Sequence, residues 1–392
     1  MEKNLDFNLA DDSQGLTGPL KGIKVFDASM GAVGPWAGAL LGQMGANVLK
    51  VEGPRGDFIS AIKPSQKGQS TTYLSLNTNK RSIEIDMKDT QQRCEAYKLI
   101  AGSDIFIENF RPGVADRIGF GWKKLSEINS RLIYASACGY GRSGPMAEIG
   151  ATDPHVQAFC GSTSVNGDEG SLKQRIRWYG HFDINTSMCI VQGILTALIE
   201  REQSGQGQLV LISMVEAAMA LQRVRLAEFL AGGNPRPMGS ETTYVAPDMI
   251  FRAADGFLAV SATNQKQWES LCRVIERCDL IKNSDFIDNR ARVKNSKQLT
   301  AQINKELAKR SIGHWLLEFG RNYVPSAKLS CFDDFRYHKH YRENKMLEDV
   351  KTPVGTMTLS GNPWYFWRNS VSVRPPPLHG QHTASVMKNG WG

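Results

Sequence analysis

The chain has 392 residues and a formal net charge of +8, with 41% hydrophobic and 22% charged residues. This length suits two or three domains, and the composition is globular, which excludes disordered, collagen-like and coiled-coil chains. The seven cysteines are scattered, so neither a disulfide framework nor a CxxC-type metal or redox site is expected. The basic surplus suits anionic partners, but Lys and Arg form no long run, which argues against nucleic acid.

The first residues, 1–12, are polar and contain no apolar segment, so we expect no secretory signal and a cytoplasmic protein. Residues 31–49 carry no charge, but their five glycines suit a buried loop and helix better than a membrane span.

Short strand patterns alternate with helix patterns in the first part of the chain. Strands are expected at 23–27, 48–52, 82–85, 105–108 and 132–136, and helices at 35–44 and 90–101. This alternation predicts an α/β fold with a mostly parallel sheet, whose ligands bind beyond the carboxyl ends of the strands. The glycines Gly31, Gly34 and Gly38 do not match GxGxxG, so a nicotinamide or flavin site is not expected. We therefore look for ligand-binding residues in the loops at 29–35, 77–81, 109–113 and 137–140.

The pattern changes in the middle of the chain. A periodic helix is expected at 184–201, a strand at 208–212 and a second helix at 214–230, followed by a Gly/Pro-rich exit at 232–237. A hairpin at 249–260 and amphipathic helices near 265–277, 298–309 and 314–319 then predict a second, smaller α+β domain. Short strands within 352–364 and a helix at 385–388 close the chain.

Short motifs follow one another along most of the chain: Gly34-Pro35, Gly45–Glu52, Gly56-Asp57, Asn77–Ser82, Glu108–Gly113, Gly139-Tyr140, Gly144-Pro145, Gly205–Gln208, Ala254–Gly256 and Gly380–Thr383. In this order and spacing they closely resemble the class III CoA-transferases, the CaiB/BaiF family, which includes formyl-CoA transferase and carnitine CoA-transferase.

The resemblance implies a large domain with a Rossmann-like parallel sheet built by both chain ends, an inserted smaller domain, and two subunits interlocked as rings. We therefore expect residues 1–212 in the large CoA-binding domain, 213–237 as a linker helix, 238–330 as the small domain, and 331–392 as the segment that completes the large domain. A homodimer and a heterodimer with a related chain are both open.

In this family the nucleophile is an aspartate that opens the helix before the Gly-x-Gly-Gln turn, and the resemblance places it at Asp183. From the residues alone, Asp183 is equally a helix N-cap, and the two roles are compatible. A helix N-terminus favours the carboxylate that attack requires. The resemblance implies that Asp183 moves CoA from an acyl-CoA donor, with succinyl-CoA as a candidate, to a carboxylic acid through anhydride and aspartyl-CoA thioester intermediates. CoA then enters as a substrate, and no metal or tightly bound cofactor is expected.

The resemblance also carries over a set of CoA-binding positions: Gly31, Ala32, Val33, Lys80, Arg81, Asn109, Phe110, Arg117, Ile118, Tyr140 and Met214. Cationic side chains suit the 3′-phosphate and pyrophosphate, and an aromatic edge suits adenine, which favours Arg117 and Phe110. Core packing is the alternative for Phe110, and a surface role is the alternative for Lys80.

Several residues near Asp183 depart from the family pattern or leave its role open. Thr186-Ser187 stands where the family often has a small residue followed by glycine, and Trp178, Tyr179 and Phe182 either contact an aromatic acid or pack in the core. An α-methylacyl-CoA racemase has the same fold but needs a histidine where Thr152 stands, and threonine does not exchange protons at neutral pH. The other alternative is a catalytic or non-catalytic subunit of a heteromeric CoA-transferase.

Overall fold

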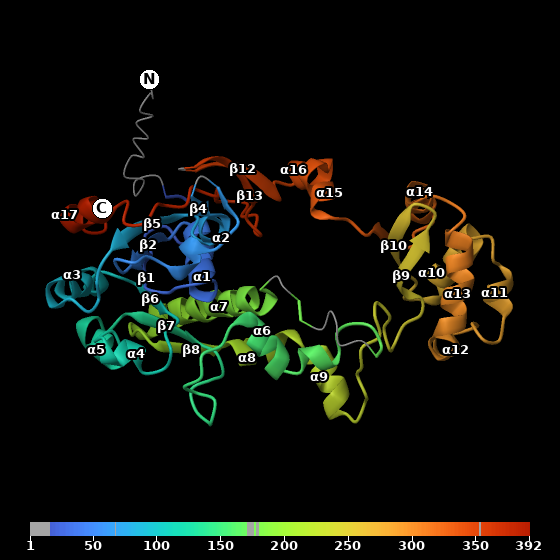
Figure 1. The fold of residues 1–392 in the computed structure, drawn as a ribbon, viewed down its shortest axis with the longest axis horizontal. Coiled ribbons are helices and arrows are strands. Elements are labelled where there is room, and N and C mark those ends of the chain that lie inside the picture. Colours follow the sequence, from blue (N-terminus) through green and yellow to red (C-terminus); the bar gives the residue numbers. More distant parts are fainter. Residues whose placement is uncertain (1–15, 67, 171–175, 178–179, 353) are drawn as a thin grey trace, which may run out of the picture. The chain divides into compact units, whose positions relative to one another are not determined.

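The computed structural model describes residues 16–392 apart from 67, 171–175, 178–179 and 353 (Figure 1). The chain divides into two compact units. The larger unit contains the chain up to Cys160, Arg177–Arg223 and Lys339–Gly392, and the second contains Gly161–Ile176 and Val224–His338. Residues 161–176 group with the second unit, although the sequence places them in the large domain.

A six-stranded parallel sheet forms the centre of the larger unit. Its strands are β1 (Lys24–Asp27), β2 (Asn47–Glu52), β5 (Lys80–Glu84), β6 (Ile105–Glu108), β7 (Ile133–Cys138) and β8 (Leu209–Ser213). The spatial order is β5-β2-β1-β6-β7-β8. Counted along the chain this is the Rossmann order 3-2-1-4-5-6, as the fold-class prediction requires, and the strand order reverses between β1 and β6.

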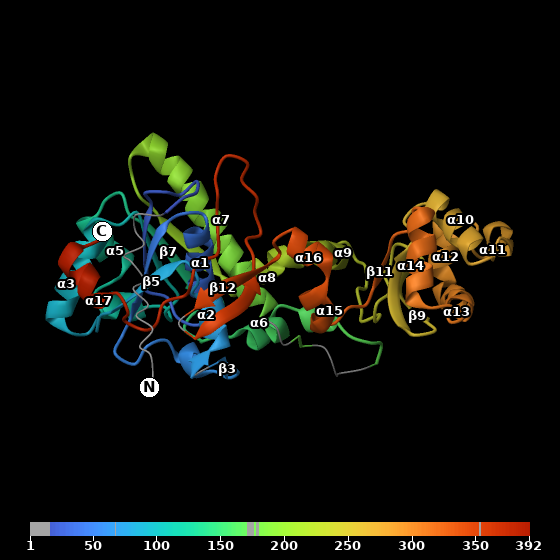
Figure 2. The same cartoon turned by 90° about the horizontal axis from the view of Figure 1, so that it is seen from above.

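The side chains alternate along each strand, and each face of the sheet packs into its own apolar core. On one face Val25 and Ile105 pack with the helices α1 (Val33–Gln43) and α7 (His181–Ser204). On the other face Phe26 and Phe106 pack with α3 (Thr90–Ala101), α5 (Trp122–Ile128) and α17 (Thr383–Asn389). Figure 2 shows α3 and α17 on the side of the sheet away from α1. The strands therefore read as continuous apolar runs because both faces are covered.

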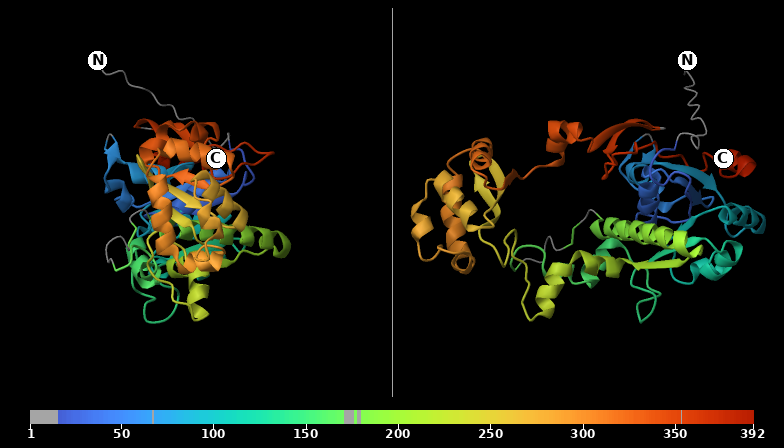
Figure 3. Two further views of the ribbon diagram at one scale, coloured as in Figure 1. Left: turned by 90° about the vertical axis from the view of Figure 1, so that its right-hand side faces the viewer. Right: turned by 180° about the vertical axis from the view of Figure 1, so that it is seen from behind.

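The helix α7 is seen along its length in the right panel of Figure 3. It is the one helix in the described part of the chain that is long and apolar enough to cross a membrane. Its buried Arg201 pairs with Asp104 at 2.9 Å, and its apolar residues pack in the core of the sheet, so α7 is a core helix here.

The larger unit contains further elements besides this sheet and its covering helices. They are η2 (Phe58–Ala61), β3 (Ser65–Gln66), β4 (Gln69–Ser70), α2 (Thr71–Leu76), α4 (Val114–Arg117), α6 (Asp153–Phe159), α8 (Met214–Leu221), α16 (Lys339–Glu343), β12 (Leu347–Thr352) and β13 (Gly355–Ser360). The C-terminal segment runs beside β5, where the backbone N–H of His382 donates to Ser82 O at 2.8 Å. The Trp391 indole donates to Leu99 O at 2.9 Å.

The second unit has an antiparallel sheet in the order β11-β10-β9 with helices packed on it (yellow to orange in Figure 1). Its elements are η3 (Ser162–Ser164), α9 (Arg223–Leu230), β9 (Asp248–Ala253), β10 (Gly256–Ser261), α10 (Gln265–Val274), α11 (Asp279–Lys282), α12 (Asn289–Lys294), α13 (Ser296–Leu307), α14 (Ile312–Arg321), β11 (Ser326–Lys328) and α15 (Phe332–Tyr337). The buried guanidinium of Arg292 lies 5.0 Å from the centroid of the Trp268 ring and donates to Ala246 O at 2.8 Å.

Several predicted bounds differ from the structure by one to five residues, and two of these differences concern helices beside the site. The helix expected at 214–230 is two helices, α8 and α9, because α8 ends at its C-cap residue Gln222. The helix expected from 184 begins three residues earlier, at His181. All seven cysteines are free thiols.

Candidate active site

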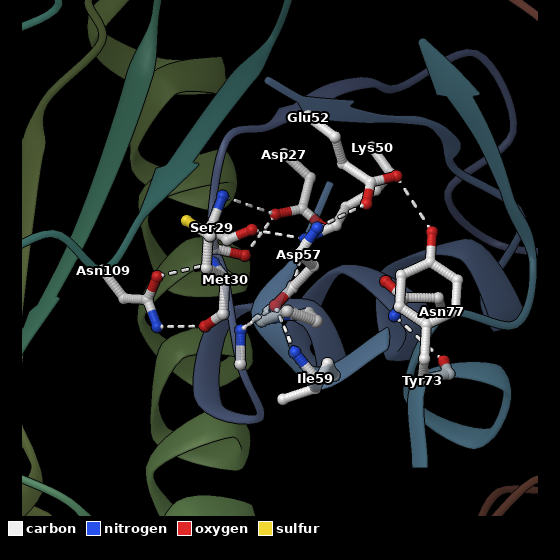
Figure 4. A network of polar contacts seen from close by, with 12 residues as sticks. Asp27, Ser29, Met30, Lys50, Glu52, Asp57, Ile59, Tyr73, Asn77 and Asn109 are labelled. Atoms are coloured by element: carbon white, nitrogen blue, oxygen red, sulfur yellow. Dashed lines mark hydrogen bonds and ion pairs between the residues drawn. The ribbon is translucent and has the colours of Figure 1, made fainter. Parts of the chain in front are cut away.

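The loops that follow β1 and β6 meet where the strand order reverses. The side chain of Asn109 accepts a hydrogen bond from Met30 N at 2.8 Å and donates one to Met30 O at 2.7 Å (Figure 4). Asn109 therefore ties the loop after β6 to the loop that leads into Gly31, Ala32 and Val33. In doubly wound sheets this position is where ligands bind.

A buried network of charged side chains, which includes Asp27, Lys50 and Asp57, supports the loop that follows β1 (Figure 4). The Gly31 N–H donates to both carboxylate oxygens of Asp57, at 3.1 and 3.0 Å, and Asp57 pairs with Lys50 at 3.0 Å. Burial opposes the charge of Lys50, but the surrounding carboxylates of Asp27, Asp57 and Glu52 keep its pKa above the ordinary value. The network therefore fixes the backbone of the loop with charges that are themselves paired.

The structure corrects the expected role of Lys80. The residues 77–81 lead into β5, so they lie at the amino end of that strand and not at the edge where ligands bind. The fully buried Lys80 ammonium donates to Asp27 at 2.7 Å, Pro35 O at 2.6 Å and Asn77 at 2.9 Å. Burial lowers the pKa of Lys80 to about 8, although Asp27 favours its charged form. All three donor positions are in use, so this ammonium stabilises the fold and does not face a phosphate.

Arg81 is also part of the fold. Its guanidinium donates to Asn47 Oδ1 at 3.1 Å and to Trp391 O at 2.7 Å, and only 8% of the residue is exposed. It joins β5 to β2 and to the C-terminal residues, so we do not place it in the CoA site.

The first turn of α7 is held by residues from two other helices. The N-cap is Gly180, in the left-handed region at φ 63°, so Asp183 is the third residue of the helix and not its cap. The backbone N–H groups of Phe182 and Asp183 donate to Oδ2 of Asp153, at 2.7 and 3.2 Å. One turn later the Ser187 hydroxyl lies 2.6 Å from Val33 O on α1. These contacts bring Asp183 close to the loop at Gly31–Val33.

The carboxyl group of Asp183 is in an environment that disfavours its charge. Burial, and next the nearby carboxylate of Asp153, raise its pKa from 3.8 to about 7. None of the residues that the structure describes donates a hydrogen bond to this carboxyl group. Burial and Asp153 therefore act on this carboxyl group in the direction opposite to the one expected from the helix N-terminus. The free N–H groups of Phe182 and Asp183 in the first turn of α7 bind Asp153.

The other predicted CoA-binding residues differ in exposure. Arg117, at the end of α4, is exposed, while Phe110 and Ile118 are half-buried against the apolar core on the α3 face. Tyr140 follows β7 and packs edge-on against Phe159 at 5.0 Å, and Met214 is buried at the start of α8. These residues follow the carboxyl ends of the strands or lie in the first helices after them, on the same edge of the sheet as Gly31.

The residues beside Asp183 have structural partners. Thr186 donates to Phe182 O within α7, and Ser187 joins α7 to α1, so this pair serves helix packing. Phe182 is a core residue with 1% exposure, whereas Trp178 and Tyr179 lie outside the described residues. Thr152 is the N-cap residue of α6, and its hydroxyl lies 2.7 Å from Nδ1 of the exposed His155.

Two supporting residues were missed from the sequence. The sequence indicated no role for Asp153, the residue after Thr152, and it showed Asp57 only as part of a family motif. The i,i+4 spacing of Asp153 and Gln157 on a short helix was the available signal for the first. Within the described ranges, no group of three His, Cys, Asp or Glu side chains could hold a metal ion.

Comparison with known proteins shows the family of the chain. The family model of CoA-transferase family III matches residues 20–383. The chain is 30% identical to succinyl-CoA:glutarate CoA-transferase of Homo sapiens over 94% of this chain and 85% of that protein. It is 33% identical to acetyl-CoA:oxalate CoA-transferase of Acetobacter aceti over 80% and 81% of the two chains. The crystal structure of a CaiB/BaiF family protein from Brucella suis matches with a TM-score of 0.84 and 27% identity over 95% of this chain and 99% of that one.

Proposed function

The chain belongs to CoA-transferase family III, and on that premise we propose that Asp183 is the nucleophile that carries CoA between two carboxylic acids. One observation carries this proposal. A carboxyl group that served only the fold would be ionised and hydrogen-bonded, yet Asp183 is partly buried, has a raised pKa, and has no donor among the described residues. Perturbed groups of this kind are typical of functional sites.

The proposed reaction has two symmetrical halves. The Asp183 carboxylate attacks the thioester carbonyl of the donor, the C–S bond breaks, and a mixed anhydride and CoA thiolate form. The thiolate then attacks the aspartyl carbonyl, which releases the donor acid and leaves an aspartyl-CoA thioester. The acceptor carboxylate attacks this thioester, and the thiolate that leaves attacks the acceptor carbonyl of the new anhydride. The products are the acceptor's CoA thioester and the free Asp183 carboxylate.

The environment of Asp183 supports its role as a nucleophile. A carboxylate that accepts no hydrogen bonds is a stronger nucleophile than a solvated or capped one, because its lone pairs are not occupied by donors. At pH 7 a group with a pKa of about 7 is also about half ionised, so the attacking form is available.

We propose that CoA lies along the carboxyl edge of the sheet. The supporting residues are the loop Gly31, Ala32 and Val33, then Asn109, Phe110, Arg117, Ile118, Tyr140 and Met214. Among these, the exposed cation of Arg117 suits a phosphate group, and the half-buried ring of Phe110 suits adenine.

The substrates are proposed from the relatives. The two related enzymes are named for the short dicarboxylates glutarate and oxalate, and the first is also named for succinyl-CoA. We therefore propose a short dicarboxylate acceptor and succinyl-CoA as a donor for this chain.

A transfer assay tests the proposal. The protein is incubated with succinyl-CoA and a panel of acids that includes glutarate and oxalate, and the acyl-CoA products are separated by chromatography and identified by mass spectrometry. We expect a new acyl-CoA with the wild type and with Asp89→Asn, a control that removes an exposed helix-capping carboxylate, and none with Asp183→Asn. Full activity of Asp183→Asn would overturn the assignment of the nucleophile.

We also propose that the chain acts as a dimer. Native mass spectrometry of the chain expressed alone tests this point. A stable homodimer that catalyses transfer supports it, whereas an unstable or inactive chain favours the heteromeric alternative.

A further inference from the structure

We propose that Asp153 and Gln157, called here the α6 pair, position the Asp183 carboxyl group for attack by fixing the first turn of α7. This inference rests on the proposed role of Asp183 as the nucleophile. The α6 pair would be a pair of positioning residues, because neither residue is placed in contact with substrate.

The α6 pair binds the chain on both sides of Gly180. Asp153 Oδ2 accepts hydrogen bonds from Phe182 N at 2.7 Å and Asp183 N at 3.2 Å. Gln157 donates to Arg177 O at 2.7 Å, and its side-chain oxygen accepts from Arg177 N at 2.7 Å. The Gln157 amide also donates to Oδ1 of Asp153, which connects the two residues. The entrance to α7 and its first turn are therefore held by one short helix.

Both residues of the pair are buried. Asp153 is 4% exposed and Gln157 is fully buried, so their bonds to the backbone do not compete with solvent. Such bonds are stronger than exposed ones and fix geometry closely. The carboxylate of Asp153 also occupies the two N–H groups nearest to Asp183. In an ordinary cap the side chain of the N-cap residue would accept from these groups, but the N-cap here is Gly180, which has no side chain, so Asp153 accepts from them instead.

The pair also acts on Asp183 through charge. Among the described residues, Asp153 is the one charged side chain that faces Asp183 closely enough to change its pKa. The other ionisable groups on the surrounding elements are His155 on α6, Glu216 on α8, Tyr73 on α2, Tyr134 and Cys138 on β7, and His181, Cys189, Glu200, Arg201 and Glu202 on α7, and α1 and β8 carry none. Glu216 is held by Ser213 at 2.8 Å, and Tyr73 by Glu52 at 2.9 Å. Removing the charge of Asp153 should therefore shift the ionisation of Asp183 to lower pH.

The test compares three variants with the wild type in single-turnover trapping. Each protein is mixed with succinyl-CoA and hydroxylamine from pH 5 to pH 9, and the hydroxamate on the Asp183 peptide is followed in time by mass spectrometry. The variants are Asp153→Asn, the double variant Asp153→Asn/Gln157→Glu, and the matched cap control Asp89→Asn. In the double variant, the carboxylate introduced at position 157 can accept from the amide introduced at position 153 and from Arg177 N. The hydrogen bonds are therefore largely kept while the negative charge lies farther from Asp183.

We expect Asp153→Asn to slow trapping at pH 8 roughly ten- to a hundredfold, because the first turn of α7 loses its fixed position. The acid limb of its pH–rate profile for trapping should move down by about one pH unit, because a like charge near Asp183 is removed. The double variant should recover much of the rate at pH 8. The KM for succinyl-CoA should stay within about twofold of the wild type, because the pair does not bind substrate.

A merely structural role gives a different result. In that case Asp153→Asn lowers the melting temperature as Asp89→Asn does, while the rate at pH 8 and the acid limb stay at wild-type values, and this outcome overturns the inference. If the wild type itself forms no hydroxamate at Asp183, the proposed function fails, and the inference fails with it. The wild-type reaction therefore distinguishes the two failures.

Discussion

Replacing Asp183 with asparagine should stabilise the protein at neutral and alkaline pH. The folded chain raises the pKa of this carboxyl from 3.8 to about 7, because burial and Asp153 disfavour its charge. A group with a raised pKa in the folded state supports folding fully below its unfolded pKa, and this support is lost as the pH rises through its folded pKa. Each pKa unit corresponds to about 1.4 kcal/mol, so a shift of this size costs the wild type at most about 4 kcal/mol above pH 7.

Asparagine does not titrate, so any constant difference in packing cancels when one pH is compared with another. The stabilisation of Asp183→Asn relative to the wild type should therefore grow by about 2–3 kcal/mol from pH 5 to pH 8. For a unit of this size, that is roughly 4–10 °C in the difference between the two melting temperatures. Thermal unfolding of both proteins at pH 5, 6, 7 and 8 measures it. A difference that is the same at every pH would refute the raised pKa, and a difference that shrinks toward pH 8 would reverse its sign.

Three further substitutions test other parts of the site. Lys80→Met leaves the carboxylate of Asp27 buried without its nearest cation and should cost about 3–5 kcal/mol of stability, measured by denaturant unfolding; unchanged stability with weaker CoA binding would instead return Lys80 to the CoA site. Arg117→Ala should raise the KM for succinyl-CoA about tenfold, and less for the thioester of dephospho-CoA if this cation binds the 3′-phosphate; equal effects on both would contradict that contact. Gly180→Ala places a Cβ 3.6 Å from Asp183 Oδ2 on a residue with φ 63°. It should lower the free energy of unfolding by about 1 kcal/mol and slow trapping at Asp183. Wild-type stability and a wild-type trapping rate would contradict both the backbone strain and the steric effect on Asp183.

Much of the fold could be predicted because its signals are local. The helix at 90–101 and the strand at 105–108 have the predicted bounds, since apolar periodicity and turn residues mark both ends. The start of α7 was placed three residues too late because its N-cap, Gly180, has no side chain of the kind that marks the beginning of a helix. The break at Gln222 was missed because no Gly or Pro marks it.

The site could be predicted only in part, because its partners are far apart in the sequence. The loop at Gly31–Val33 and Asn109 follow from the sheet topology, which brings the ends of β1 and β6 together. A lysine such as Lys80 can bind a phosphate. Its partner Asp27 is 53 residues away in the sequence, so the sequence did not show that the Lys80 ammonium forms a buried ion pair. Asp153 likewise binds α7 from 30 residues away.

The central claim is that Asp183 carries CoA covalently. The most direct measurement is peptide mass spectrometry of the wild type and Asp183→Asn after incubation with succinyl-CoA and hydroxylamine. We expect a hydroxamate on the Asp183 peptide that depends on the acyl-CoA and is absent from the variant. CoA transfer by the wild type with no modification at Asp183, or with a hydroxamate on another residue, would contradict it.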